Sequence, residues 1–342
     1  MSPRNRASSN SDTWFAVKLG EPLSSLMTYA GPSFERVEEI QREDLVRRGG
    51  FGPRTSPILV KGAVHAWPAS ERWTFERLGA LRRPDGSEVM TRFSNGLVEQ
   101  GVTKLPLDLP VGPYIQGLAD ARSQLPGDDA GLLPYSRWKQ IGFGEKFHLN
   151  WSYMNSFKPD RVYLAQWNIL DEFPEMRKDF AIRQLWPGWR WTWEYVFIGP
   201  AQTVTGFHYD FPNNWFCQVQ GTKEIMVFPP DQSPNLCKSL KYDWGATLSD
   251  IDISRLDAMP REREQFAKAH GIYARVESGD ALFIPKQNWH AVVSLEPSIS
   301  LGVFGLTPSE IVFGGVPQEV RHLLHTLHLY RWNNCACHRM TA

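Results

Sequence analysis

The sequence has few cysteines, and it lacks both a net charge and a long apolar run. Four Cys in 342 residues are too few for a disulfide framework, which favours a reducing compartment. Lys plus Arg and Asp plus Glu both total 37, so no basic excess predicts nucleic-acid binding. No stretch reaches the roughly 20 apolar residues that span a membrane. Residues 1–13 are polar without the apolar segment of a secretory signal, which predicts a cytoplasmic protein, or a nuclear one in a eukaryotic host.

What the chain does contain is a set of short segments with clear periodicity. Apolar residues at near-helical spacing predict a helix from Gly31 to Gly50, and residues 57–62 read as a strand. A further helix is predicted from Ser70 to Leu81. Near the end, Thr307 to Glu310 is a capping-box pattern. A longer helix, with a regular apolar face, is predicted from Pro317 to Trp332.

The chemistry is concentrated in the stretch from residue 203 to 230. His208 and Asp210 lie in a run that alternates like a strand, and a Gly221-x-Lys223 turn follows. Because residues two apart on a strand point to the same face, His208 and Asp210 present an imidazole and a carboxylate side by side. These are two of the three ligands of a two-histidine, one-carboxylate site for non-haem Fe(II).

A third ligand must come from another strand, and His290 is the candidate. It follows a Gly-Asp turn, an apolar strand ending at Pro285, and a short turn, and it begins a second apolar strand. A lone His-x-Asp is more often a surface or core pair than a metal site. The motifs near His208 and His290 occur together and in a fixed sequence order, which favours the metal site. We therefore predict His208, Asp210 and His290 as both metal ligands and catalytic residues.

Over residues 55–306 these motifs resemble the JmjC-type cupin oxygenases, especially factor inhibiting HIF and the small hydroxylases related to it. The resemblance implies a mainly β fold with flanking helices, built on a double-stranded β-helix, also called a jelly-roll or cupin barrel. It implies Fe(II) as metal and 2-oxoglutarate as cosubstrate, with O2 consumed. By position, Lys223 and Thr205 match residues that hold the distal carboxylate of 2-oxoglutarate, Tyr163 matches a tyrosine reaching the same group, and Asn214 an amide near the cosubstrate. One departure is Phe304, which stands where close relatives have an Asn.

The resemblance also predicts how the chain is divided. Residues 1–20 are expected to be a disordered tail, and 21–160 an N-terminal α/β region packed on the barrel. The barrel is expected over 161–306, with an insertion at 231–270. C-terminal helices and a Cys/His tail are expected over 307–342. In the resembling family such helices often form a dimer, so a homodimer is possible here.

Three functions are compatible with the sequence. The first is hydroxylation of a peptide or protein side chain, with release of succinate and CO2. The second is the same chemistry on a natural product, a methyl-lysine or an RNA base, although the neutral charge makes nucleic acid a less favoured partner. The third is a cupin-like binding protein without turnover. Two smaller questions stay open: whether the aromatic run Trp186–Trp193 lines a substrate groove or packs in the core, which is favoured, and whether Cys335, Cys337 and His338 bind a second metal.

Overall fold

The computed structural model describes residues 13–15, 28–30, 32–51, 54–94, 97–98, 104–123, 163–189, 191–200, 203–243, 245–251, 259–332 and 334–335. The predicted tail over 1–20 lies outside these residues except for 13–15. These form β1 (Thr13–Phe15), which pairs with β2 (Thr28–Ala30). Within the described ranges, no helix combines the length and the apolar character that crossing a membrane would require.

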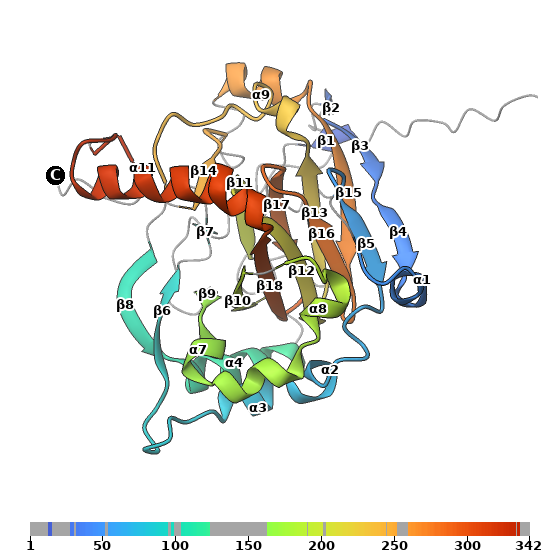
Figure 1. Ribbon diagram of the computed structural model, residues 1–342, viewed down its shortest axis with the longest axis vertical. Helices are drawn as coiled ribbons and strands as arrows, with labels where there is room; N and C mark the ends of the chain where they lie inside the picture. The colour runs from blue at the N-terminus through green and yellow to red at the C-terminus, as the bar shows by residue number, and fades with distance from the viewer. Residues whose placement is uncertain are drawn as a thin grey trace, which may run out of the picture.

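Two seven-stranded sheets form the centre of the protein (Figure 1). The first sheet consists, in spatial order, of β4 (Glu38–Gln41), β5 (Ile58–Lys61), β16 (Ala281–Ile284), β12 (Asn213–Gln220), β18 (Ser298–Leu306), β10 (Trp191–Gly199) and β9 (Leu164–Trp167). The second consists of β14 (Ala246–Leu248), β11 (Val204–Asp210), β17 (Trp289–Ser294), β13 (Lys223–Phe228), β15 (His270–Val276) and β3 (Ser33–Arg36), with β7 (Leu97–Val98) beside β11. From β10 to β13 the chain alternates between the sheets, and it does so again from β15 to β18. This is the predicted jelly-roll, or cupin, arrangement.

Helices cover the first sheet, and two cores result. Figure 1 shows α2 (Ala69–Arg72), α3 (Phe75–Gly79), α4 (Val111–Ser123) and α7 (Ile169–Glu172) gathered together below the strands. Buried side chains such as Trp73, Phe75 and Trp215 fill the outer core beneath these helices. The inner core lies between the sheets and contains Phe216, Ile225 and Leu282 among others. Alternate side chains of β12 therefore pack into the two cores, which is why every position of the strand except Gln220 is buried.

The helix predicted from Gly31 to Gly50 is mostly wrong. Residues 33–41 form β3 and β4, and only Arg42–Arg47 is helical, as α1. β3 pairs in parallel with β15, and β4 with β5, so each strand extends a sheet edge. The backbone hydrogen bonds and packing available at these edges outweigh a modest helix propensity. The predicted end at Gly49 and Gly50 is real, since both have positive φ.

Two other helices differ from the prediction at their boundaries. The helix expected from Ser70 to Leu81 is divided into α2 and α3, because Thr74 caps α3 by accepting a hydrogen bond from the Arg77 N–H. The C-terminal helix α11 (Val316–Thr326) ends six residues before Trp332. His328 then takes a positive φ, which the helix cannot continue through. The predicted capping box is confirmed at the start of α10 (Pro308–Glu310), which leads through a π-helical turn, η7 (Ile311–Gly315), into α11.

The remaining elements are short and lie at the edges of the barrel. The 231–270 insertion, between β13 and β15, contributes β14 beside β11. The others are β6 (Met90–Ser94), β8 (Lys104–Pro110), η4 (Pro174–Asp179), α8 (Ile182–Leu185), η5 (Pro230–Gln232) and α9 (Pro260–Phe266).

Candidate metal centre

Two neighbouring strands of the second sheet bring three potential ligands together. β11 carries His208 and Asp210, β17 carries His290, and the antiparallel register places His208 opposite His290. The Asp210 Oδ2 lies 4.0 Å from the Nε2 of His208 and 3.5 Å from the Nε2 of His290. The donor atoms of all three residues lie within 4.8 Å of one another. This spacing leaves room for one ion between them.

The histidines are oriented by backbone carbonyls. The Nδ1–H of His208 donates to the Gly206 carbonyl at 2.8 Å, and that of His290 donates to the Asn288 carbonyl at 3.1 Å. Each hydrogen bond fixes the tautomer in which Nε2 carries the free lone pair, and each Nε2 faces the carboxylate. Sequence reasoning missed Gly206 and Asn288 as partners, because a backbone acceptor leaves no residue-type signal.

Burial keeps both imidazoles neutral. The pKa of His208 falls to about 4 because burial disfavours the charged ring. The pKa of His290 also falls to about 4, through burial and then the neighbouring His208, although Asp210 offsets part of the effect. Burial raises the pKa of Asp210, and His290 opposes that rise. Two neutral imidazoles and one carboxylate suit a divalent transition metal, and among such metals this ligand set is characteristic of non-haem Fe(II). The residues therefore fit the ion that the sequence predicted.

The residues matched to the cosubstrate gather in the same barrel. Lys223 begins β13, is fully buried, and has its Nζ 3.4 Å from the hydroxyl of Tyr163. Tyr163 in turn shares a hydrogen bond with the Thr205 side chain on β11. The structure thus brings Lys223, Tyr163 and Thr205 into one cluster, although they are up to 60 residues apart in sequence.

This cluster has unusual electrostatics. No carboxylate contributes to the shift of the Lys223 pKa, which burial lowers to about 7. The ammonium lies 5.3 Å from the centre of the Phe216 ring and 5.7 Å from that of Tyr163. A buried lysine surrounded by hydroxyl and aromatic groups is prepared for an anionic partner.

Asn214 and Phe304 lie opposite each other on β12 and β18. The Asn214 side chain is buried, and its Oδ1 has no hydrogen-bond partner. Phe304 is buried and packs its ring edge-to-face against Tyr195, with ring centres 5.8 Å apart. An Asn at position 304, as expected in close relatives, would place a second amide beside Asn214. Phe304 places an aromatic ring there instead.

The aromatic run on β10 and before it is divided between two roles. Trp186 and Trp189 are buried and stacked, with ring centres 5.3 Å apart. Trp191 and Trp193 are 57% and 44% exposed. Trp193 lies opposite Phe304 in the β10–β18 register, so the exposed pair lies on the strand that borders Phe304.

The possible second metal site cannot be followed in full, because Cys337 and His338 lie outside the described residues. Cys335 is described, and its Sγ contacts the Trp332 carbonyl. Across the described part of the chain, the only grouping of three potential metal ligands is His208, Asp210 and His290.

Fold and site together define a jelly-roll protein with a two-histidine, one-carboxylate centre inside its barrel. The family model for the cupin-like domain matches residues 50–304, and the chain belongs to that family. The predicted relationship to JmjC-type cupins is confirmed.

Relatives of known name differ in what they are described to do. The chain is 32% identical over 152 residues to Jumonji C domain-containing protein 5 of Drosophila melanogaster, covering 41% of this chain and 35% of that protein. It is 30% identical over 274 residues to lysine-specific demethylase JMJ30 of Arabidopsis thaliana, covering 75% and 51%. It is 29% identical over 254 residues to tRNA wybutosine-synthesizing protein 5 of Gallus gallus, covering 74% and 71%. The chain spans only about a third of the first protein and half of the second.

Proposed function

We propose that this protein is an Fe(II)- and 2-oxoglutarate-dependent oxygenase that hydroxylates a peptide or protein side chain. The observation that carries the proposal is the grouping of the partly buried Asp210 with the buried His208 and His290, with both Nε2 atoms turned toward the carboxylate. When bound there, iron with 2-oxoglutarate supplies the oxidation of an unactivated C–H bond by O2, with release of succinate and CO2.

The protein's own residues have separable tasks in this account. His208, Asp210 and His290 hold the ion. Lys223 and the Tyr163 and Thr205 hydroxyls receive the distal carboxylate of 2-oxoglutarate, and Lys223 pairs with it by a charge-assisted hydrogen bond. The orphaned Oδ1 of Asn214 and the Phe304 ring lie on the facing first sheet, where they shape the remaining space and exclude water.

The substrate class is tested by supplying Fe(II), 2-oxoglutarate and O2 with three kinds of candidate. These are unmodified peptides, peptides bearing methyl-lysine, and tRNA or its nucleosides. We expect succinate release to be stimulated most by an unmodified peptide, which gains one oxygen atom in its mass spectrum. Formaldehyde release from the methyl-lysine peptides would indicate a demethylase, as the name of the Arabidopsis relative suggests. Oxidation of tRNA would favour a nucleic-acid substrate. No succinate with any candidate or a natural-product panel would favour a binding protein.

The affinity for 2-oxoglutarate is expected to fall as the pH rises above about 7. In the free protein the Lys223 pKa is about 7, and a bound carboxylate raises it by favouring the charged amine. Above the free pKa, binding must therefore take up a proton, and the dissociation constant should increase by about tenfold per pH unit. Below that pKa it should be nearly constant. Anaerobic titration of the Fe(II) protein at several pH values measures this, and a flat profile across pH 7 to 9 would contradict it.

We also propose that a second copy of the chain covers α11. Val316, Val320, Leu323 and Leu327 recur at spacings of four, three and four residues and are each at least 50% exposed. Such a stripe on one helix face suits helix-to-helix packing. Light scattering should give a dimer for the wild type and a monomer for Val320→Glu, while Val46→Glu, a matched exposed valine on α1, should stay dimeric. A monomeric wild type at tens of micromolar would contradict the pairing.

A further inference from the structure

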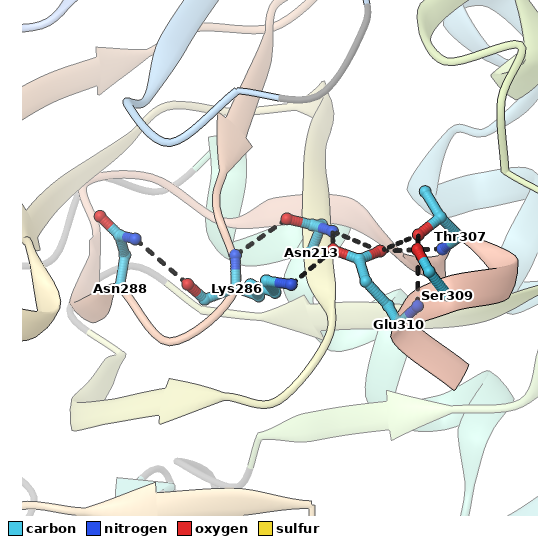
Figure 2. Close-up of polar contacts among 6 residues, drawn as sticks. All are labelled: Asn213, Lys286, Asn288, Thr307, Ser309 and Glu310. Carbon is cyan, nitrogen blue, oxygen red and sulfur yellow. Dashed lines mark hydrogen bonds and ion pairs between the residues drawn. The ribbon is translucent and has the colours of Figure 1, made fainter. Parts of the chain in front are cut away.

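The Glu310 carboxylate accepts far more hydrogen bonds than a helix cap requires. Its Oε2 receives the Thr307 backbone N–H at 2.8 Å, and the Glu310 N–H donates back to the Thr307 Oγ1 at 3.4 Å, which completes the capping box. The same Oε2 also receives the Thr307 hydroxyl at 2.9 Å. Its Oε1 receives the Lys286 ammonium at 2.8 Å, and the Asn213 Nδ2 lies 3.3 Å from the same oxygen (Figure 2). Glu310 therefore joins the start of α10 to two residues outside the C-terminal helices.

Both outside partners lie within four residues of a metal ligand in the sequence. Asn213 begins β12, three residues after Asp210, and its Oδ1 accepts the Lys286 backbone N–H at 3.0 Å. Lys286 lies in the turn between β16 and β17, four residues before His290. Figure 2 shows Asn213 between the turn and Glu310, with dashed contacts to both. One buried amide and one carboxylate thus fix the position of the turn.

The turn itself is held in a conformation that it would not adopt freely. Gln287 has φ of 61°, in the left-handed region that non-glycine residues rarely adopt. Its N–H donates to the Asp210 carbonyl at 2.9 Å. The Asn288 side chain donates to the Lys286 carbonyl at 3.2 Å, and the Asn288 carbonyl accepts the Nδ1–H of His290. The orientation of His290 is therefore set by this turn.

We propose that Glu310 is a positioning residue for the metal centre, acting through Lys286 and Asn213 on the turn that orients His290 and contacts Asp210. The inference rests on the proposed metal-dependent function and deepens it by tying the C-terminal helices to the ligand set. Among the described residues, the hydrogen bonds and ion pair of Glu310 reach Thr307, Asn213 and Lys286 and none of the three metal ligands, so its effect on those ligands passes through Lys286 and Asn213.

The contrasting explanation is that Glu310 only caps α10, and the two roles use different partners. Thr307 belongs to the cap, whereas Lys286 belongs to the turn. Burial would raise the pKa of Glu310, but the hydrogen bonds from Lys286 and Thr307 outweigh it and lower the pKa. In Glu310→Gln the amide NH2 must face either the Lys286 ammonium or the Thr307 N–H, and in both cases the ion pair with Lys286 is lost. Lys286→Met removes the contact with the turn and leaves the cap, whereas Thr307→Ala weakens the cap and leaves the contact with Lys286.

The test compares four variants of the full-length protein. These are Glu310→Gln, Lys286→Met, Thr307→Ala, and Glu319→Gln as a matched exposed glutamate on α11. Two quantities are measured: the anaerobic dissociation constant for Fe(II), and the hydrogen exchange of residues 286–290 in metal-free protein.

We expect Glu310→Gln and Lys286→Met each to weaken Fe(II) binding about tenfold, as loss of a residue supporting the metal ligands does elsewhere. Amide exchange in the turn should be about tenfold faster in both. Their double variant should add little to either single one, because both break the same contact. Thr307→Ala should lower the melting temperature with a smaller effect on iron, and Glu319→Gln should match the wild type.

Two outcomes would overturn the inference. One is wild-type turn exchange and iron affinity in Glu310→Gln. The other is loss of both in Thr307→Ala with none in Lys286→Met, which would reduce Glu310 to a cap. If the wild type binds no Fe(II), the proposed function fails, but the exchange measurement still decides whether Glu310 holds the turn.

Discussion

Replacing Asp210 with Ala is expected to abolish Fe(II) binding and turnover while leaving the fold intact. The carboxylate is the one anionic donor of the three, and without it two neutral imidazoles must hold a divalent ion. Loss of a supporting residue already costs about 10–100-fold in metal affinity, so loss of a ligand should cost at least about 100-fold. The melting temperature of metal-free protein should fall little, because burial already raises the pKa of Asp210 and makes its charge costly.

Anaerobic Fe(II) titration and thermal melting measure the two quantities on one sample. Asp250→Ala provides a matched control, because Asp250 is an exposed aspartate two residues beyond β14, which pairs with β11. Asp210→Asn, which keeps the side-chain shape, should lose iron nearly as fully as the alanine variant. Wild-type iron affinity in Asp210→Ala would show that Asp210 is not a ligand.

Replacing Lys223 with Met is expected to change two properties in opposite directions. The 2-oxoglutarate concentration needed for half-maximal turnover should rise about 10–100-fold, because a charge-assisted hydrogen bond is lost. The metal-free, cosubstrate-free protein should become more stable, by on the order of 1–3 kcal/mol, because a fully buried ammonium with a pKa lowered to about 7 is removed.

This opposition separates a binding role from a structural one. A lysine retained for packing would lower stability when replaced and would leave the cosubstrate requirement unchanged. Lys268→Met, which removes an exposed lysine paired with Glu264, should alter neither quantity. A wild-type 2-oxoglutarate requirement in Lys223→Met would show that the distal carboxylate of 2-oxoglutarate binds elsewhere in the barrel.

The grouping of His208, Asp210 and His290 could be predicted from sequence because it depends on local rules. His208 and Asp210 lie two apart on a strand, and His290 begins another strand after a recognisable turn. The tasks proposed for Lys223, Tyr163 and Thr205 came from the family resemblance alone. Their clustering depends on how β9, β11 and β13 are placed, and no periodicity in the chain specifies that placement.

The errors and omissions share a tertiary origin. Residues 33–41 have a helix-like spacing, yet β15 and β5 present open edges that capture them as strands. The Thr307 to Glu310 capping box was visible in the sequence, because both partners lie within one helical turn. The contacts of Glu310 with Asn213 and Lys286 span 97 and 24 residues and depend on a strained turn at Gln287. Only the folded chain brings those groups together.

The central claim is that the barrel holds a competent Fe(II) and 2-oxoglutarate site. The most direct measurement is anaerobic: Fe(II) and then 2-oxoglutarate are added to the full-length protein, and visible absorption is recorded, with His208→Ala as control. We expect a charge-transfer band that appears only after 2-oxoglutarate and is missing in His208→Ala. No band in either protein, with Fe(II) and 2-oxoglutarate in excess, would contradict the assignment of an oxygenase and favour a cupin-like binding protein.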